Sequence, residues 1–298
     1  MSRNRIIIIR LQGGLGNQMF QYAAAKSLSI QTDSSLYFDT SLLDLNKDAT
    51  DDFTPRKFDL NIFKNINNLL IEKINHTSFK IGKKVFSNRG LFSTRIQIYN
   101  EPHFHADKNY FNIQPPVVLT GYFNSEYYFK QIKDILLNDF NFPDINVDDN
   151  NFKIKKCIEE NDFVAIHIRR GDYLKPKVTS YHGLCSLEYY QQAIEYFKKN
   201  NPMINLCFFS DDPQWVKDTF TKKYNNCIII EGNTDENSWK DMYLMSLCKH
   251  HIIANSTFSW WGAWLSLHKD KMVFAPKKWF NEKSINSENV IPITWKVL

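Results

Sequence analysis

Cysteine is scarce and scattered in this sequence. Its 298 residues include five cysteines, and none of them forms a C-x-x-C pair: Cys157, Cys185, Cys207, Cys227 and Cys248. An odd, scattered set argues against a disulfide framework, and the missing C-x-x-C spacing argues against a zinc site. The sequence therefore predicts a protein of a reducing compartment.

Long apolar runs and basic runs are also missing. The opening stretch MSRNRIIIIRLQGG is broken by Arg10 and is too short for a signal peptide or a membrane span. Lysine and arginine outnumber aspartate and glutamate by 37 to 32, but no five basic residues stand together. This balance suits an anionic small ligand or a membrane surface better than nucleic acid. We expect a cytoplasmic protein, at most peripheral at the inner face of a membrane, without a nucleic-acid partner.

What the sequence does contain is a pattern of two α/β halves. With 43% hydrophobic residues, a chain of this length is large enough for its core to split in two. In the first half we predict strands at residues 5–11 and 117–121, helices at 17–30 and 125–139, and short helices and loops across 40–112.

The polar stretch PDINVDDNN, residues 143–151, is the predicted linker, so we place the domains at residues 1–150 and 151–298. Beyond it apolar strands alternate with helical stretches. The expected strands are 163–168, 205–210, 227–231, 251–254 and 271–274, and the expected helices are 187–200, 213–223, 237–248 and 257–267. This alternation is typical of a doubly wound parallel sheet, in which ligands bind at the carboxyl ends of the strands.

The stretch GGLGNQM follows the first strand and opens the first helix. Aligned from Gly14, the pattern G-x-G-x-x-G has Met19 in place of its third glycine, and no Lys-Ser/Thr follows. It is therefore neither a complete dinucleotide fingerprint nor a phosphate-binding P-loop, and a glycine turn at this place is most often only a turn. Asn17 and Gln18 add two amides able to hydrogen-bond a polyol.

HIRRGDY follows the apolar run at 163–166. Arg169 and Arg170 are adjacent in an extended segment, so their side chains start on opposite sides and only one is expected to face a ligand. An arginine fork binds phosphate in a bidentate manner without a metal. The alternative is a buried pair between one arginine and Asp172, and the default for His167 is a buried core histidine.

NSTFSWWGAW lies between a strand and a helix, with hydroxyls and an amide at capping positions: Asn255, Ser256, Thr257 and Ser259. Such a helix start can be a nest for an anion, but for this stretch taken alone an ordinary N-cap with buried tryptophans is the favoured interpretation. In Ser210-Asp211-Asp212, helix capping is the favoured reading over a metal or ribose contact.

Two further features are weaker. Asp241 is, by default, a solvated or capping acid. His103 and His105 resemble half a metal site but lack a third ligand nearby, so we expect no metal.

Taken together, GGLGNQMFQYA, HIRRGDY, FFSDD and NSTFSWWGAWL resemble the bacterial alpha-1,2-fucosyltransferase family, in this order and spacing, from about residue 6 to 279. The resemblance implies an α/β fold of GT-B type, with two Rossmann-like domains facing across a cleft. The first domain would take the acceptor and the second GDP-fucose, and the last helix or tail can return to the first domain. The implied reaction is inverting transfer of L-fucose from GDP-beta-L-fucose to O2 of a terminal galactoside, without a metal or other cofactor.

The resemblance also implies roles for individual residues. Arg170 would hold the diphosphate with Arg169 in support, and His167 would lie near the ribose or base. Asp241 would read guanine, although its match is looser. Thr257 and Ser259 would contact phosphate, with Asn255 and Ser256 at the same helix start. Gly14 and Asn17 would face donor and acceptor from the first domain. No residue is fixed as the catalytic base; Asp172 is the best carboxylate of the motif and is equally suited to orienting an arginine.

Other functions stay open from the sequence alone. The fucosyl acceptor or linkage can differ, with an O-fucosylated polypeptide as one variant. From another class, the many aromatic and amide side chains suit a non-catalytic glycan-binding module. A nicotinamide oxidoreductase is disfavoured by the missing third glycine.

Overall fold

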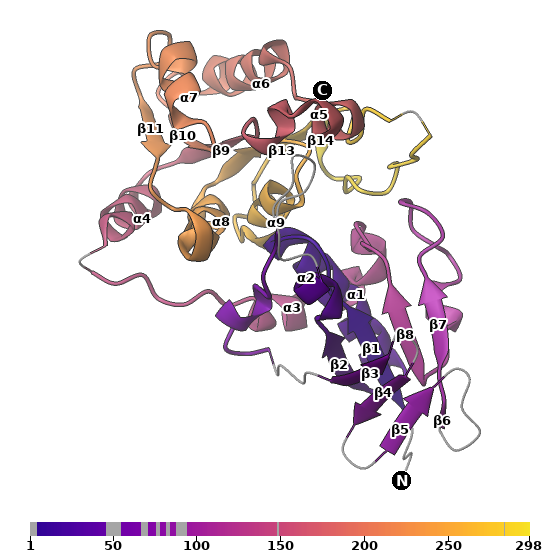
Figure 1. Ribbon diagram of the computed structural model, residues 1–298. Coiled ribbons are helices and arrows are strands. Elements are labelled where there is room, and N and C mark those ends of the chain that lie inside the picture. The colour runs from indigo at the N-terminus through magenta and orange to yellow at the C-terminus, as the bar shows by residue number, and fades with distance from the viewer. Residues whose placement is uncertain are drawn as a thin grey trace. The chain divides into compact units, whose positions relative to one another are not determined.

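The computed structural model describes residues 5–45, 55–66, 71–75, 78–81, 84–87, 94–147, 149–282 and 284–298. These divide into two compact units. The first comprises Met1–Pro143 with Asn286–Val290, and the second Asp144–Ile285 with Ile291–Leu298 (Figure 1). The chain passes between the units after Pro143, whereas the sequence placed this boundary after residue 150. Among the described residues, no helix is long and apolar enough to cross a membrane.

The first unit is built on a four-stranded parallel sheet of order β2-β1-β8-β7. Its strands are β1 (Ile6–Arg10), β2 (Ser35–Asp39), β7 (Gln97–Asn100) and β8 (Val117–Thr120), and the helix α1 (Leu15–Gln31) follows β1. Ile7, Ile8 and Ile9 are fully buried, as the run of four isoleucines predicts for a central parallel strand.

A second, smaller sheet of order β3-β4-β5-β6 belongs to the same unit. It contains β3 (Glu72–Asn75), β4 (Ser78–Ile81), β5 (Lys84–Ser87) and β6 (Thr94–Arg95). Phe79 and Phe86 face each other across β4 and β5 and pack with Ile6, Ile8 and Val118 of the main sheet. The prediction of only short helices and loops in 40–112 is therefore wrong for these strands. Parts of that segment, such as residues 46–54, lie outside the described residues.

The remaining helices of the first unit are short: α2 (Ser41–Leu45), α3 (Lys133–Asp139) and the 3-10 turns η1 (Leu60–Ile62), η2 (Tyr110–Asn112), η3 (Glu126–Tyr128) and η4 (Lys130–Ile132). The predicted helix at 125–139 is thus α-helical only from Lys133 onward. Phe129, with φ −147°, separates the two 3-10 turns, and Ser125 caps the first by accepting from the Tyr127 amide.

The second unit is a six-stranded parallel sheet of order β11-β10-β9-β12-β13-β14. The strands are β9 (Phe163–Ile168), β10 (Asn205–Ser210), β11 (Cys227–Ile230), β12 (His250–Ile252), β13 (Val273–Ala275) and β14 (Lys296–Val297). Its helices are α4 (Asn150–Glu160), α5 (Pro176–His182), α6 (Leu187–Asn200), α7 (Pro213–Phe220), α8 (Trp239–Leu247) and α9 (Thr257–Leu265), with the 3-10 turns η5 (Asp172–Leu174) and η6 (Asp235–Asn237).

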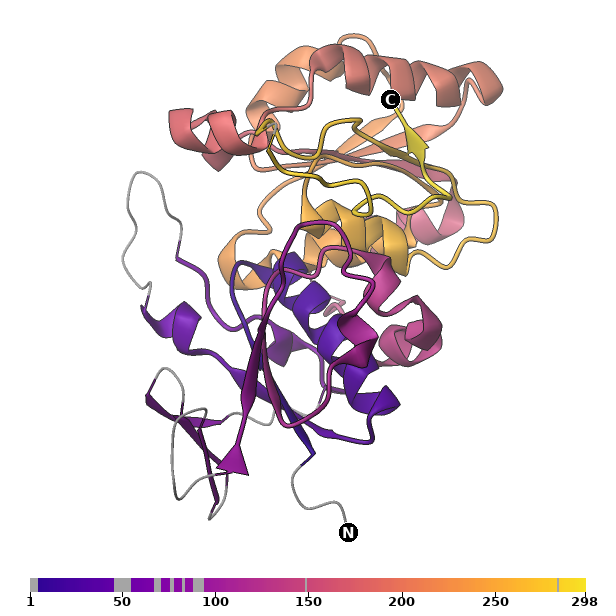
Figure 2. The ribbon, with the colours of Figure 1, turned by 90° about the vertical axis from the view of Figure 1, so that its right-hand side faces the viewer.

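Helices cover both faces of this sheet (Figures 1 and 2). Val164 and Ile166 of β9 pack against α6 and α7, whereas Phe163 and Ala165 pack against α4 and α8. The alternation follows from the pleat, which turns successive side chains to opposite faces. The predicted doubly wound α/β architecture is confirmed, with strand and helix ends shifted by a few residues.

Candidate functional site

The second unit has a topological switch point beside β9. From β9 the chain order runs outward through β10 and β11 on one side, and through β12, β13 and β14 on the other. The exits of β9 and β12 therefore diverge, which is where open parallel sheets bind ligands. The predicted stretches 167–173, 210–212 and 255–264 follow the adjacent strands β9, β10 and β12, so the sheet brings them together at one edge.

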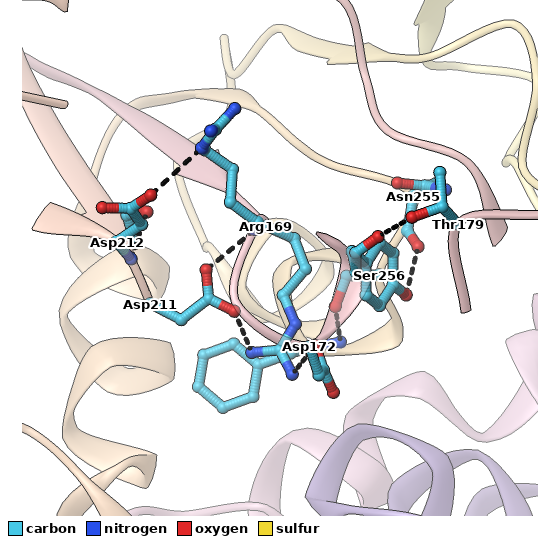
Figure 3. A network of polar contacts seen from close by, with 11 residues as sticks. Arg169, Asp172, Thr179, Asp211, Asp212, Asn255 and Ser256 are labelled. Carbon is cyan, nitrogen blue, oxygen red and sulfur yellow. Dashed lines mark hydrogen bonds and ion pairs between the residues drawn. The ribbon is translucent and has the colours of Figure 1, made fainter. Parts of the chain in front are cut away.

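Arg169 is held by two carboxylates. Its Nη2 lies 2.7 Å from Asp172 Oδ1 and its Nη1 lies 2.9 Å from Asp211 Oδ2 (Figure 3). Burial lowers the pKa of Arg169, but the charges of Asp211 and Asp172 outweigh burial and leave that pKa raised. The alternative of an Arg–Asp pair within the motif is thus confirmed for Arg169, whose outer nitrogens are engaged inside the protein.

Arg170 has a different environment. Its Nε lies 3.1 Å from Asp212 Oδ2, and its guanidinium carbon lies 4.1 Å from the centre of the Trp215 ring. Its backbone N–H donates to Asp211 Oδ1 at 2.8 Å. Within the described part of the chain, neither Nη of Arg170 has a hydrogen-bond partner. Because two Nη groups are what a bidentate phosphate contact requires, the open fork belongs to Arg170.

Glycine is required between the arginines and the carboxylates. A Cβ on Gly171 would stand 2.7 Å from Asp211 Oδ2 and 3.0 Å from its Cγ. A side chain at this position would displace the Asp211 carboxylate from its present contacts with Arg169 and the Arg170 amide.

The loop after β12 is tied to the HIRRGDY loop. Tyr173 donates its hydroxyl to the Asn255 carbonyl at 3.2 Å. The Asn255 side-chain amide donates to the carbonyls of His182, Gly183 and Trp279, and its oxygen accepts from Cys185. The side-chain amide of Asn255 thus holds the loop, and the predicted contact of Asn255 with the donor stays a prediction.

The helix α9 begins beside this loop. Ser256 is its N-cap and accepts from the Phe258 amide at 3.3 Å, as predicted. The buried Ser259 hydroxyl donates to the Ser256 carbonyl at 3.3 Å. Thr257, the first helical residue, is half-buried. A helix start attracts an anion through its free amides and dipole, so Thr257 and the first-turn amides are the groups here suited to phosphate.

His167 is buried near the end of β9, with its ring centre 5.9 Å from that of Phe258. Burial, helped by the charge of Arg169, lowers its pKa to about 3, so it is neutral at physiological pH. Among the described residues its Nδ1 has no hydrogen-bond partner. A neutral imidazole can donate or accept toward a nucleoside, the predicted role, but cannot add positive charge.

Asp241 lies in the first turn of α8, after the exit of β11. Its Oδ1 accepts from Asn233 Nδ2 at 2.7 Å, and Asn233 exchanges two further hydrogen bonds with Asn151 of α4. Burial raises the pKa of Asp241 to about 7, although the Asn233 hydrogen bond opposes this. Such a carboxyl gains from a ligand N–H that holds it ionised.

In the first unit, the glycine turn lies between β1 and α1. Gln18 is fully buried, donating to the Gly13 and Lys57 carbonyls and accepting from the Asp59 amide. The Gln18 amide therefore holds the turn in place, and the prediction that it hydrogen-bonds a polyol is wrong. Asn17 is half-buried, and Arg56 stands 3.7 Å from where a Cβ on Gly14 would be.

The structure adds residues that sequence reasoning did not assign to the site: Asp211, Asp212, Trp215 and Arg56. The first three face the arginines only because β10 lies beside β9, a pairing no local pattern reveals. His103 and His105 stack with ring centres 4.7 Å apart, and no group of three metal-binding side chains occurs in the described ranges.

Two α/β units with parallel sheets, and an arginine pair at a switch point, fit the fold of GT-B glycosyltransferases. The structure matches that of fucosyltransferase NodZ from Bradyrhizobium with a TM-score of 0.50 and 15% identity, over 87% of this chain and 92% of that one. The chain belongs to glycosyl transferase family 11, whose match spans residues 6–298.

Relatives extend the likeness. The chain is 35% identical to an alpha-1,2-colitosyltransferase of Escherichia coli, over 97% of this chain and 98% of that protein. It is equally similar, at 35%, to the O-antigen biosynthesis glycosyltransferase WbnK of Escherichia coli, over 92% and 95% of the two chains. Human galactoside alpha-(1,2)-fucosyltransferase 1 is 28% identical over 35% of this chain and 29% of its own length.

Proposed function

We propose that this glycosyltransferase moves L-fucose from GDP-beta-L-fucose to O2 of a terminal galactoside, with inversion. The observation that carries the proposal is the position of Arg170. Its two Nη groups have no partner among the described residues, and it follows β9 at the switch point, at the edge of the sheet where α9 begins. A diphosphate leaving group needs this combination of a fixed guanidinium and helix amides.

The relatives support the choice of donor and linkage. Two of them carry alpha-1,2 in their names, and one structure of NodZ, described as an alpha-1,6-fucosyltransferase, was co-crystallised with GDP. A GDP-sugar donor and a 1,2 linkage are therefore the combination we propose for this chain.

In the proposed reaction, O2 of the galactoside attacks the anomeric carbon opposite the diphosphate. The bond from that carbon to the β-phosphate oxygen breaks through an oxocarbenium-like state as the bond to O2 forms, and GDP leaves. The proton of the attacking hydroxyl is released to solvent water. Negative charge grows on the phosphate, where Arg170, Thr257 and the first amides of α9 stabilise it. These groups would act in place of the divalent ion that other transferases use.

Asp172 is better suited to orientation than to proton transfer. Its Oδ1 lies 2.7 Å from Arg169 Nη2, so this oxygen is engaged in an ion pair within the protein. We therefore propose that Asp172 orients Arg169, and that the base is not Asp172.

A second candidate is colitosyl transfer, favoured by the 35% identity to the alpha-1,2-colitosyltransferase over nearly the whole chain. Colitose is L-fucose without its 3-hydroxyl group. The same GDP contacts would serve either donor, so the difference must lie in the protein groups near the sugar 3-position.

The deciding experiment incubates the protein with GDP-fucose or GDP-colitose and a panel of galactosides, and determines linkage and anomeric configuration by NMR. An alpha-1,2-fucosylated product supports the proposal, and turnover only with GDP-colitose supports the second candidate. A glycan-binding module would form no product and would gain no thermal stability from GDP.

A further inference from the structure

Asp241 is one end of a chain of four polar side chains in the second unit. Its Oδ1 accepts from Asn233 Nδ2 at 2.7 Å. Asn151 Nδ2 donates to Asn233 Oδ1 at 2.9 Å, and Asn233 Nδ2 donates back to Asn151 Oδ1 at 2.8 Å. Asn151 Nδ2 also donates to Asp149 Oδ1 at 2.7 Å. A carboxylate thus lies at each end of the chain, and two paired amides join them.

The two carboxylates determine which way both amides point. An ionised carboxylate only accepts hydrogen bonds, so Asp149 and Asp241 must each face an amide NH2 group. If either amide turned over, its oxygen would lie against a carboxylate and the paired hydrogen bonds would break. Asp149 is itself fixed, because it accepts from the Asn151 backbone amide at 2.9 Å and pairs with Lys240. The network therefore holds Asn233 Nδ2 against Asp241 from a fixed point at the start of α4.

One oxygen of Asp241 is left for a ligand. None of the described residues donates a hydrogen bond to its Oδ2. Two lysines of the neighbouring helices have carboxylate partners of their own, since Lys240 of α8 pairs with Asp149 and Lys155 of α4 pairs with Glu159. Asp241 Oδ2 is therefore the atom to which a ligand N–H can donate.

Asp241 and Arg170 belong to the same edge of the sheet. β9, β10 and β11 are adjacent parallel strands, so their carboxyl ends meet at one edge. Arg170 follows β9, and Asp241 is in the first turn of α8, the helix that follows β11. The loop before α8 has space beside Gly232, where φ is +85° and a Cβ would meet no atom within 4 Å. A nucleotide held by its diphosphate at Arg170 can thus extend its base along this edge.

We propose that Asn233 is a positioning residue for the nucleotide base, holding Asp241 so that Oδ2 accepts from the N–H edge of guanine, with Asn151 as its support. Guanine presents two N–H donors side by side at N1 and N2, whereas adenine presents an unprotonated N1 at that edge. A carboxylate fixed in one orientation therefore selects guanine more strongly than one that is free to turn. This inference rests on the proposed function for the GDP donor and adds the residues that make its base specific.

The Asn233 hydrogen bond also favours the charged form of Asp241. Burial raises the pKa of Asp241 to about 7, and the hydrogen bond from Asn233 opposes burial. Loss of the Asn233 amide should therefore raise this pKa above 7, so that less of Asp241 is ionised at neutral pH.

The test measures the GDP dissociation constant of Asn233→Ala by calorimetry across neutral and alkaline pH. We expect a rise of about tenfold at pH 7, the order of one hydrogen bond to a charged group. The bend in its pH dependence should move to higher pH than in the wild type. The ADP dissociation constant should stay within about twofold, because adenine does not donate to Asp241 from that edge. A merely structural loss would weaken GDP and ADP alike and leave the bend in place.

Asn161→Ala is the matched control. Asn161 follows the other end of α4, and its Nδ2 donates to the Cys157 carbonyl at 2.9 Å, so this variant also removes one side-chain hydrogen bond of an asparagine beside that helix. Its GDP affinity and pH dependence should equal those of the wild type. A GDP dissociation constant equally raised in Asn161→Ala, or a bend that does not move in Asn233→Ala, would overturn the positioning role.

Two further variants test whether Asn233 acts through Asp241. In an Asp241→Asn background, Asn233→Ala should add little to the loss of GDP affinity, because the two residues work as one unit. Fully additive losses would overturn the inference. Asn151→Ser leaves Asn233 in place without its support, so the bend should move in the same direction by a smaller amount. This variant serves if Asn233→Ala does not fold, and an unmoved bend would again overturn the inference.

A titration without nucleotide separates this inference from the proposed function. Isotope-edited NMR of the Asp241 carboxyl carbon in the free protein should show its midpoint at higher pH in Asn233→Ala than in the wild type. An unchanged midpoint would overturn the positioning role whatever the reaction. Selective GDP binding with the expected shifts, but no sugar transfer, would overturn the proposed function and leave the inference standing. A wild-type protein that binds ADP as tightly as GDP would overturn the inference, and sugar transfer by the same protein would leave the transferase function standing.

Discussion

Arg170 lies with its guanidinium carbon 4.1 Å from the centre of the Trp215 ring. Asp212 fixes both residues, because its Oδ2 is 3.1 Å from Arg170 Nε and its Oδ1 accepts from the Trp215 amide at 3.1 Å. Arg170 is therefore held at Nε by Asp212 and on one face of its guanidinium by the Trp215 ring. Its two Nη groups are left for a ligand. A guanidinium oriented in advance loses less freedom when it binds phosphate.

Replacing Arg170 by alanine should abolish most transfer while leaving the fold intact. We expect kcat/KM to fall by about 10²–10³, as when one transition-state donor is lost. Thermal unfolding should change little, because the Arg170–Asp212 pair is partly exposed and Asp212 still caps α7. Arg170→Lys keeps the charge without the fork and should recover only a fraction of the activity. Full activity in either variant would remove the phosphate role.

Arg169→Ala should behave differently, with a clear loss of stability. It leaves Asp172 and Asp211 beside each other without their shared cation, whereas Arg170→Ala frees only Asp212. Since these side chains are about a quarter exposed, we expect a cost of roughly 1–3 kcal/mol in the free energy of unfolding. Urea denaturation of the two variants compares them directly. An Arg169→Ala protein as stable as Arg170→Ala would show that the ion pairs of Arg169 with Asp172 and Asp211 contribute nothing to the stability of the fold.

Asp172→Asn tests orientation against proton transfer. If Asp172 orients Arg169, asparagine keeps one acceptor oxygen, so turnover should drop only a few-fold, to the extent that one charge-assisted hydrogen bond is weakened. The GDP affinity and the pH dependence of kcat should be unchanged. Disappearance of an acidic limb from the pH–rate profile would instead identify Asp172 as the base.

The arginine motif shows what local sequence can and cannot predict. Side chains of adjacent extended residues start on opposite sides, and Arg169 and Arg170 do take different partners. Their partners Asp211 and Asp212 lie forty-odd residues away, and only the pairing of β10 with β9 brings them close. The surroundings of both arginines thus depend on the order of the strands in the sheet, which the hydrophobic periodicity of the sequence does not encode.

Burial explains the same contrast in the fold. All six residues of β9, FVAIHI, are buried, and their apolar run was enough to predict a central strand from the sequence. The strands EKIN, SFKI and KVFS of the small sheet mix lysine and asparagine with a few apolar residues, and they carry weak strand propensity. They are strands because Phe79 and Phe86 reach the first unit's core, a tertiary contact that overrides local preference.

Chelation should leave the activity unchanged. Arg170 and the start of α9 are proposed to carry the charge that a divalent ion carries in other transferases, so initial rates with excess EDTA should match those in its absence. As a control, magnesium and manganese are added back at millimolar levels. A strong loss in EDTA that one metal restores would contradict the arginine-based mechanism.

Asp241 should link donor affinity and stability to pH. Its pKa in the folded protein is about 7 against an ordinary 3.8, because burial penalises the charged form more than Asn233 stabilises it. Folding therefore takes up a proton between about pH 4 and 7, and stability falls as the pH rises through this window. Among nearby charged groups, Lys240 of the same helix is paired with Asp149, the N-cap of α4, so it does not offset that burial.

If the ionised carboxylate binds the nucleotide base, the GDP dissociation constant should rise about tenfold per pH unit below 7 and level off above it. Calorimetric titrations of GDP from pH 5.5 to 8.5 measure this, with Asp241→Asn as the control that should bind weakly at every pH and flatten the stability profile. A wild-type dissociation constant that does not vary with pH would separate Asp241 from the nucleotide.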